Sequence, residues 1–455
     1  MKIAKKAIYR NVHAVPTLRF EDQQLTSFSG LVVFQVLFAR LRLKERLQQC
    51  VSHLHSTGVY RLDTILQCLI VHILLGYRKL QDRAYYGDDP MVQRMLGIEQ
   101  LPSVPTLSRM LREFDGASVE KQWQMNRELV TAAAQRGEFT RVTLDFDGSV
   151  QSTKRHAEGT AVGFNKHQKG ARSYYPLFCT VAQMGQVFDV WHRPGNVHDS
   201  HDAPAFVRAC VQEWRAALPG MIIEVRMDSA FFSEEMVTLL DELGVLYTVS
   251  VPFERLAELK QRIEQRRWWW RMAGEQAYFE AHWKPKCWSL KHRFVFVRAR
   301  VAQQRKEPIQ LDLFTPQVYG YEFKVILTNH GAGARHVVAF HEGRGYQEHV
   351  FGELKTDGAM AYVPTQTCLG NQVYLWAGIM AHNLAREVQM RVAQPARRTT
   401  EKRSPLWCFH SLRHLRQLWI QRAGRFTRPG GELTLTLSAN PAVQQAFLQY
   451  LQDAA

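Results

Sequence analysis

The sequence predicts an α/β protein in which a mixed five-stranded sheet flanked by helices is interrupted by a β-rich insertion and preceded by a helical N-terminal domain. Up to about residue 137, apolar residues recur at the helical period, and from Arg141 the period changes to two. Strand and helix patterns then alternate to residue 251, which is typical of a sheet covered by helices. From 252 to 320 this order gives way to a stretch rich in Trp and Arg with short strand-like runs, and a strand pattern resumes at Tyr321.

The first part of the chain predicts several helices. Residues 31–47 carry apolar side chains at helical spacing, and residues 63–76 predict a buried helix. In the segment 102–114, two prolines precede a short amphipathic run. This run could be the recognition helix of a helix-turn-helix, with Arg109 and Arg112 facing DNA. The same pattern also fits an ordinary helix pair in a bundle.

The central part predicts three antiparallel strands followed by alternating strands and helices. The expected strands, of which the second and third form a hairpin, are 142–147, 175–182, 187–193, 222–228 and 246–251. Helices are expected at 200–218 and 233–244, and Ser233 is a plausible N-cap of the second.

After the insertion, the pattern predicts a strand at 321–329 and helices near 340–355 and 371–392. Five parts are therefore expected: a helical N-terminal DNA-binding domain (1–137), the first part of the core (138–251), the β-rich insertion (252–320), the second part of the core (321–393) and a basic C-terminal region (394–455).

The charge balance favours a polyanionic partner. The chain has 58 Lys and Arg against 42 Asp and Glu, a formal net charge of +16. Nucleic acid is the commonest partner of such an excess, although a basic globular protein without one has the same composition.

Cysteine usage and hydropathy indicate a protein of a reducing compartment. The seven cysteines are far apart with no CxxC pair, which argues against a disulfide framework and a zinc ribbon. The most apolar stretch, 65–76, is interrupted by polar residues and is too short to span a bilayer. We therefore expect a soluble, cytoplasmic protein with no membrane partner.

Acidic residues stand at the ends of two predicted strands. In Thr143-Leu-Asp-Phe-Asp-Gly-Ser, the period of two puts Asp145 and Asp147 on one face, and Asp228 ends the strand 222–228. Ligands in open α/β sheets bind outside the carboxyl ends of the strands. These positions therefore predict catalytic or metal-binding carboxylates, while turn and cap roles for the same residues stay open.

A third carboxylate is predicted by helical geometry. If 341–355 is one helix, His341, Arg344, Glu348 and Lys355 fall on one stripe, so that a carboxylate lies between cations. A solvated helix with i, i+4 ion pairs would show the same pattern. Each of the glycines at 343, 345 and 352 destabilises a helix by about 1 kcal/mol relative to alanine. Their presence suggests that another part of the protein or a ligand approaches the helix backbone closely at these positions.

Such a set suits phosphodiester chemistry. Two divalent ions held about 3.5–4 Å apart activate the attacking oxygen and stabilise the leaving one. Mg²⁺ prefers hard oxygen ligands, so two or three carboxylates suffice, and flanking Arg and Lys side chains would hold neighbouring phosphates.

The spacing His341-x2-Arg344-x3-Glu348-x6-Lys355 resembles the Y-x2-R-x3-E-x6-K signature of DDE transposases of bacterial insertion sequences. The Asp-x-Asp-Gly-Ser strand end and the Arg-Met-Asp-Ser-Ala-Phe block are similar to the other two blocks of that family, in the same order over about residues 142–392. The resemblance implies an RNase H-like catalytic core and a triad of Asp147, Asp228 and Glu348. It also implies that these acids hold Mg²⁺, two ions with Mn²⁺ as a substitute, and that Arg344, Lys355 and His341 contact DNA.

Two features qualify the resemblance. The signature tyrosine is His341 here, and Asp145 is a rival for the first acid. In the insertion, the run Arg266-Arg-Trp-Trp-Trp-Arg suggests that Trp268, Trp269 or Trp270 binds DNA by holding an unstacked base, although packing in the core of the insertion explains the same residues.

The resemblance implies a transposase that cleaves the terminal inverted repeats of its own element and transfers the strand to target DNA. Relatives act as homodimers or larger synaptic complexes on double-stranded DNA. Such a protein is expected in the bacterial cytoplasm, associated with the nucleoid when bound to DNA. Two alternatives are an RNase H-like nuclease or resolvase without strand transfer, and a non-catalytic DNA-binding protein derived from a transposase.

Overall fold

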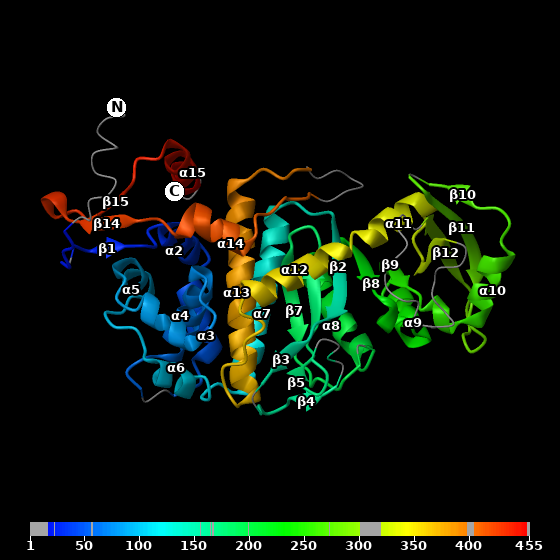
Figure 1. Cartoon of the computed structure of the whole chain (residues 1–455), viewed down its shortest axis with the longest axis horizontal. Coiled ribbons are helices and arrows are strands. Elements are labelled where there is room, and N and C mark those ends of the chain that lie inside the picture. The colour runs from blue at the N-terminus through cyan, green and yellow to red at the C-terminus, as the bar shows by residue number, and fades with distance from the viewer. Residues whose placement is uncertain are drawn as a thin grey trace.

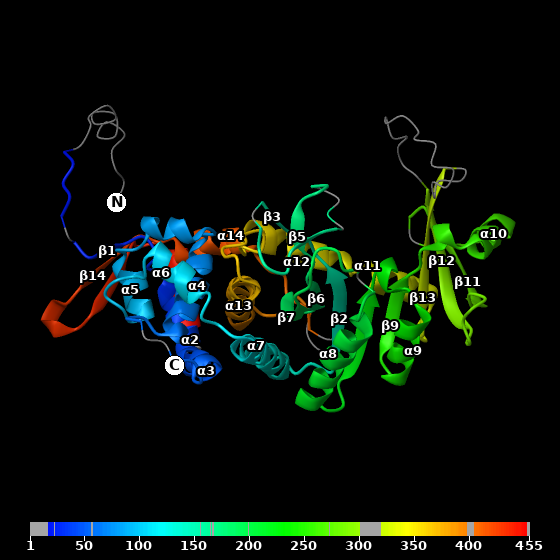
Figure 2. The same cartoon turned by 90° about the horizontal axis from the view of Figure 1, so that it is seen from below.

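The structure, a computed structural model, describes residues 17–452 except 22, 56–57, 155, 164, 166–167, 199, 273, 301–319 and 398–404. The molecule is elongated (Figure 1): a helical region lies at one end, a sheet fills the rest, and the long helix α13 (Cys368–Val392) stands between them. Figure 2 shows the same succession from below, with β11, β12 and α10 at the end farthest from the helical region.

The central sheet has nine strands in the order β10-β11-β12-β13-β9-β8-β2-β6-β7. Their bounds are β2 (Arg141–Gly148), β6 (Leu177–Val181), β7 (Gln186–Trp191), β8 (Ile222–Met227), β9 (Leu246–Ser250), β10 (Trp270–Arg271), β11 (Gln276–Trp283), β12 (His292–Arg300) and β13 (Tyr321–Thr328). The five strands expected before residue 252 are neighbours in this sheet, with β2, β8 and β9 parallel and β2, β6 and β7 antiparallel.

The sheet is larger than the five strands expected. β13 pairs with β9 on one side and with β12 on the other, and β11 and β10 follow. The described strands of the insertion therefore extend the central sheet, because the strand that follows the insertion is placed between them and the core.

Helices cover both faces of the sheet. The side chains of Leu144 and Phe146 pack with those of α8 (Ala203–Ala217) and α9 (Glu234–Glu242). On the opposite face, Phe178 and Val190 pack against α12 (Gly345–Thr356) and α13. Farther along, α11 (Ala334–Glu342) lies on β12 and β13, and α10 (Ala257–Gln265) packs through Leu259 into the core that Phe279 and Phe294 share. Odd-numbered residues of β2 therefore face α12.

The described part of the N-terminal region is mainly helical. Its helices are α2 (Leu31–Arg40), α3 (Leu43–Val51), α4 (Leu62–Leu75), α5 (Pro90–Leu96), α6 (Val104–Met110) and α7 (Gly116–Arg136), with a 3₁₀ turn at Leu80–Tyr85. α4 is buried along nearly its whole length, and it ends at Gly76 in the left-handed conformation that favours glycine. It packs against α13, whose interior residues are also buried, so one apolar core joins the helical region to α12 and α13.

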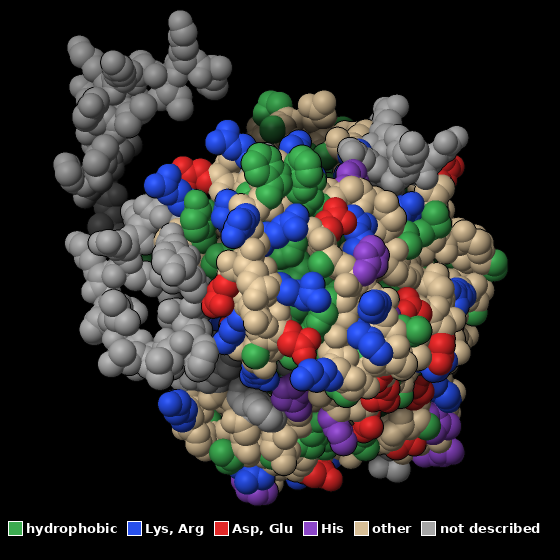
Figure 3. Space-filling model, turned by 90° about the vertical axis from the view of Figure 1, so that its right-hand side faces the viewer, with side chains coloured by type: hydrophobic (Ala, Val, Ile, Leu, Met, Phe, Trp, Pro, Cys, Tyr) green, Lys and Arg blue, Asp and Glu red, His purple; other side chains and the backbone are tan. Residues whose placement is uncertain are grey.

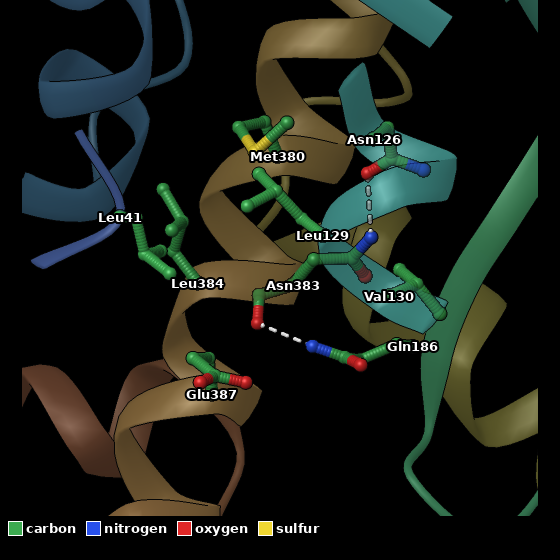
Figure 4. Close-up of a pocket in the computed structure, with 9 residues that line it drawn as sticks. All are labelled: Leu41, Asn126, Leu129, Val130, Gln186, Met380, Asn383, Leu384 and Glu387. Atoms are coloured by element: carbon green, nitrogen blue, oxygen red, sulfur yellow. Dashed lines mark hydrogen bonds between the residues drawn. The ribbon is translucent and has the colours of Figure 1, made fainter. Parts of the chain in front are cut away.

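The edge strand β7 is covered by side-chain amides. Asn126 of α7 donates to the carbonyls of Val187 and Phe188, and the Val187 N–H donates to Asn383 of α13. Figure 4 shows Asn383 also bonded to Asn126, and Gln186 donating to the Asn383 carbonyl. The cavity beside them, about 10 Å³, is about the size of one water molecule. These bonds satisfy an edge that would otherwise be open to another strand.

A small sheet between β2 and β6 was not expected. It has the order β3-β5-β4, with β3 (Gln151–Thr153), β4 (Ala161–Val162) and β5 (Arg172–Tyr174). It is docked on the start of α13: the Glu158 N–H donates to the Gln366 carbonyl, and the Cys368 N–H donates to the Glu158 carboxylate. The strands are too short to show a period of two in the sequence.

The C-terminal segment returns to the helical region. It contains α14 (Leu412–Leu415), a π-helical turn (Arg416–Ile420), β14 (Gly424–Thr427), β15 (Thr434–Leu437) and α15 (Pro441–Gln452), and β14 lies between β15 and β1 (Leu25–Thr26). Among the helices of the described residues, none combines the length and the apolar character needed to cross a membrane.

Candidate active site

Two acidic residues lie at the carboxyl ends of neighbouring parallel strands, at the same edge of the sheet. In the register of β2 and β8, Phe146 lies beside Met227, so Asp147 and Asp228 are the next residues on each strand. Neighbouring strands are about 4.7–4.9 Å apart. Asp228 accepts a hydrogen bond from the Ala230 N–H at 2.9 Å, which caps the 3₁₀ turn Ser229–Phe231. The fold therefore brings two of the three predicted carboxylates together.

Asp145, the rival first acid, has a structural partner. It is 1% exposed, and its two carboxylate oxygens accept from Arg226 Nε and Nη2 at 2.6 and 2.7 Å. Burial raises the pKa of Asp145, and the Arg226 guanidinium acts in the opposite direction. Because Asp145 is buried and paired with Arg226, Asp147 is the better candidate for the first acid of the predicted triad.

The segment 341–355 is two helices, not one. α11 ends at Gly343 and α12 begins at Gly345, so helical geometry cannot be carried across Arg344. Gly343 is one of the three glycines suspected of a close approach, and a Cβ there would lie 2.3 Å from Arg226 Nη1. The other two, Gly345 and Gly352, have nothing within 4 Å of that position.

The break corrects the expectation for His341. This side chain is 2% exposed, and its ring nitrogens are hydrogen-bonded to Ser250 and Thr248 of β9 at 2.8 and 2.9 Å. Burial and nearby cations hold the pKa of His341 well below its usual range. His341 therefore fixes α11 to the sheet, and it is not placed to contact DNA.

Arg344 and Lys355 interact with Asp147, and Glu348 is connected to it only through Arg344. Arg344 Nη1 lies 3.0 Å from Asp147 Oδ2, and Arg344 Nη2 lies 4.0 Å from Glu348 Oε1. Burial lowers the pKa of Lys355, and the Asp147 carboxylate acts against that shift. The Glu348 side chain is 70% exposed, so its carboxylate can reach a substrate on the surface.

The three acids do not form a closed ligand set. Within the described ranges, no group of three or more His, Cys, Asp or Glu side chains is close enough to hold a metal ion. The donors nevertheless fit Mg²⁺ in kind, because they are hard carboxylate oxygens and two of them come from adjacent strand ends. The Arg344 guanidinium pairs with Asp147 at 3.0 Å and lies 4.0 Å from Glu348, so a cation is already present beside these two acids.

A pocket of about 640 Å³ opens beside Asp228. Among its lining residues are Tyr175, His198 and Arg255. Its charges are mixed, because Asp228 and Glu254 face the same space as Arg255. One side of the acid pair is therefore open to a ligand.

The three consecutive tryptophans have different environments. Trp269 is 8% exposed and packs edge-on against Phe279 at 4.6 Å, so it belongs to the core of the insertion and not to a DNA-binding surface. Trp268 and Trp270 are 67% and 57% exposed. Of the three, only Trp270 lies in the edge strand β10 (Trp270–Arg271), whose two residues are both exposed.

The exposed tryptophans lie in a basic surface. We define the β10 patch as the exposed residues Arg266, Arg267, Trp268, Trp270 and Arg271. Figure 3, which views this end of the molecule, shows many Lys and Arg side chains around exposed hydrophobic groups, with fewer acids between them. The combination of cations and aromatic faces suits a nucleic-acid backbone and its bases.

Arg109 and Arg112 are both exposed, at the end of α6 and just after it. The apolar face of α6 is buried through Leu107 and Met110. α6 lies in the helical region, which α13 separates from the sheet in Figure 1. The contact of Arg109 and Arg112 with DNA stays a prediction.

Sequence reasoning missed Arg226. It lies inside β8, pairs with Asp145, and donates through Nη1 to the Phe340 carbonyl at the end of α11 at 2.8 Å. A charged residue within an apolar strand, opposite an aspartate of the neighbouring strand, was the available signal.

Comparison with known proteins gives a family for this arrangement. Among solved structures, the chain is similar to a piggyBac transposase synaptic complex with hairpin DNA, at 11% identity over 78% of this chain and 75% of that one, with a TM-score of 0.40. It is also similar to a Mos1 transposase paired-end complex with the left transposon end, at 12% identity over 43% and 59% of the two chains, with a TM-score of 0.18. A comparison with curated protein sequences finds no relative. Residues 10–454 match the family described as Transposase DDE domain group 1, and because the match spans nearly the whole chain, this protein belongs to that family of DDE transposases.

Proposed function

We propose that this protein is the transposase of a bacterial insertion sequence, which cleaves DNA at terminal inverted repeats and transfers the strand to target DNA. The observation that carries the proposal is the convergence of Asp147 and Asp228 at adjacent strand ends, with Arg344, Glu348 and Lys355 of the α12 region beside them. The block β7-β6-β2-β8-β9, three antiparallel strands followed by parallel ones, supports an RNase H-like core.

In this proposal Asp147, Asp228 and Glu348 are the triad and hold Mg²⁺, as two ions, or Mn²⁺ in its place. The metal supplies activation of the attacking oxygen and charge compensation for the leaving one. Asp147 and Asp228 are fixed by their strands, whereas Glu348 is exposed on α12. Arg344 leaves Asp147 to contact a DNA phosphate, and Lys355 holds a second one.

The remaining surfaces are assigned to DNA. The β10 patch and the exposed Arg109 and Arg112 would hold double-stranded DNA of the terminal repeats or of the target, aided by the net charge of +16. Like other transposases of this mechanism, the protein would act as a homodimer or a larger synaptic complex. We place it in the cytoplasm, associated with the nucleoid when bound to DNA.

The test is cleavage of duplex DNA that carries the ends of the element, with Mg²⁺ and with EDTA. Asp228→Asn is expected to keep DNA binding and to lose cleavage by about a hundredfold or more, because a carboxylate ligand of the metal ion would be removed. Asp88→Asn, the same change on an exposed carboxylate of the helical region, should cleave like the wild type. Unchanged cleavage by Asp228→Asn would reject the triad.

A second reaction separates a transposase from a nuclease with the same core. A pre-cleaved end with a free 3′-OH is incubated with a target plasmid and Mg²⁺. A transposase joins the two DNAs, and a nuclease or resolvase without strand transfer leaves them separate.

A further inference from the structure

We propose that a pocket between the small sheet and α12 binds one unpaired DNA strand next to the phosphate that is cut. The pocket measures about 510 Å³, and the residues that carry the argument are Ser152, Lys154, Lys355, Ala361 and Tyr362. This inference rests on the proposed function, because it names where the substrate strand lies relative to the triad.

The pocket begins where the candidate active site ends. Its wall starts at Val150, three residues after Asp147, and its opposite side is formed by Lys355. Lys355 is the residue whose ammonium interacts with the Asp147 carboxylate. Three residues of extended chain span at most about 10 Å, so a strand whose phosphate lies at Asp147 would reach the pocket within about three nucleotides, since successive phosphates of a strand rise by about 3.4 Å.

The charge of the pocket suits a phosphodiester. Among the described residues, its lining contains two lysines, Lys154 and Lys355, and no carboxylate. The pocket on the other side of the acid pair contains Asp228 and Glu254. A polyanionic strand is therefore attracted to the first pocket more strongly than to the second.

Size and shape favour a single strand. Pockets of roughly 300–1,000 Å³ enclose small organic ligands, so this one has room for a nucleotide but not for stacked base pairs with both backbones. Tyr362 contributes a half-buried ring to the lining, which is a surface on which a base can stack. Ser152 and Thr153 of β3 and Lys355 of α12 line the same pocket, so the small sheet forms a wall of this subsite.

Binding is measured by fluorescence anisotropy of the full-length chain, in EDTA, with a labelled oligothymidine of about ten nucleotides and a duplex of the same length. Lys154→Glu is expected to weaken oligothymidine binding about three- to tenfold more than Lys169→Glu, and to make the salt dependence shallower by about 0.7 per lost phosphate contact. Both lysines are exposed in the segment between β2 and β6, but Lys169 is outside the pocket lining. Duplex binding should change equally in the two variants.

A second variant fills the pocket without changing charge. Ala361 is exposed in a turn, so Ala361→Trp should fold with an unchanged Tm and should also lose oligothymidine binding. Equal effects of Lys154→Glu and Lys169→Glu on the single strand, or full binding by Ala361→Trp, would overturn the proposal. Because the assay needs neither metal nor cleavage, its result is independent of the test of Asp228.

Discussion

Asp145 and Asp147 stand two residues apart on one strand and on one face, yet their surroundings assign them different tasks. Asp145 is enclosed with Arg226, whereas Asp147 lies at the strand exit beside Arg344. From the sequence, the candidates for the first acid of the triad were these two residues. The sequence could not choose between them, because the choice depends on Arg226, which is 81 positions farther along the chain than Asp145.

This difference can be tested by paired variants. Asp145→Asn leaves the Arg226 charge without its partner in a buried site, so we expect a loss of about 3–5 kcal/mol in the free energy of unfolding. Asp147→Asn weakens the partly buried pair with Arg344, so it should cost less than Asp145→Asn, about 1.5–3 kcal/mol, and should abolish DNA cleavage. Urea unfolding measures the stability of the two variants, and the cleavage assay measures their activity. A stable Asp145→Asn protein without cleavage would reverse the assignment.

Arg344 Nη1 forms an ion pair with Asp147 Oδ2 at 3.0 Å. A guanidinium and a divalent cation compete for the same carboxylate, so Arg344→Ala is expected to raise the affinity for Mn²⁺ about tenfold, equivalent to about 1.4 kcal/mol. Isothermal titration calorimetry without DNA measures this affinity. Arg335→Ala, at an exposed arginine of α11, is the control, and an equal affinity in both variants would show that Arg344 does not compete.

At the scale of the element, α12 is held by a buried charge cluster behind its exposed face. Glu353 accepts a hydrogen bond from Arg386 Nη2 at 2.5 Å and another from the Leu412 N–H, and His382 Nε2 lies 3.6 Å away. Burial acts to raise the pKa of Glu353, but His382 and Arg386 outweigh it and hold that pKa at about 2. The cluster therefore joins α12, α13 and the C-terminal segment.

Glu353→Gln is expected to lower the free energy of unfolding by about 3–5 kcal/mol at pH 7, because it leaves Arg386 buried without its anion. The folded-state pKa of Glu353 is below its ordinary value of 4.5, so its contribution is fully present above pH 4.5 and is lost as the pH falls towards 2. The stability difference between wild type and variant should shrink in that window. Urea unfolding at several pH values measures it, and Glu342→Gln, at an exposed position of α11, should show no such difference.

Elements with a long regular pattern could be predicted from the sequence, and those set by distant contacts could not. The strand β2 and the helices α9 and α13 follow from their periods and from the Ser233 cap, whose hydroxyl accepts from the Met236 N–H. The break at Gly343 depends on the close approach of Arg226, from a strand more than a hundred positions earlier. The small sheet depends on its docking to the start of α13.

At the scale of the whole molecule, Arg416 of the C-terminal segment contacts both the helical region and the end of α12. It is 4% exposed, donates to the carbonyls of Ile73 and Leu74 at the end of α4, and pairs with Asp357 at the end of α12. The helical region and the helix that carries Glu348 and Lys355 therefore share one buried cation.

Arg416→Met is expected to lower the Tm and to destabilise the fold by about 3–5 kcal/mol, because Asp357 and the helix-end carbonyls lose their donor. Arg413→Met is the matched control: Arg413 also pairs with Asp357 but is 69% exposed, so its loss should cost about 0.5 kcal/mol or less. Thermal unfolding compares the two. Similar Tm values for both variants would show that Arg416 does not hold the helical region and α12 together.

The pairing of β1 with β14 has a consequence for biosynthesis. The Ser29 hydroxyl donates to the Arg422 carbonyl across 393 positions, and Leu25 lies opposite Arg425. At roughly 5–20 residues per second, a ribosome needs about 20–80 s to deliver that distant segment after the first strand has emerged. A nascent polypeptide therefore leaves this early strand without its neighbour, open to chaperones and proteases until the distant segment has been synthesised.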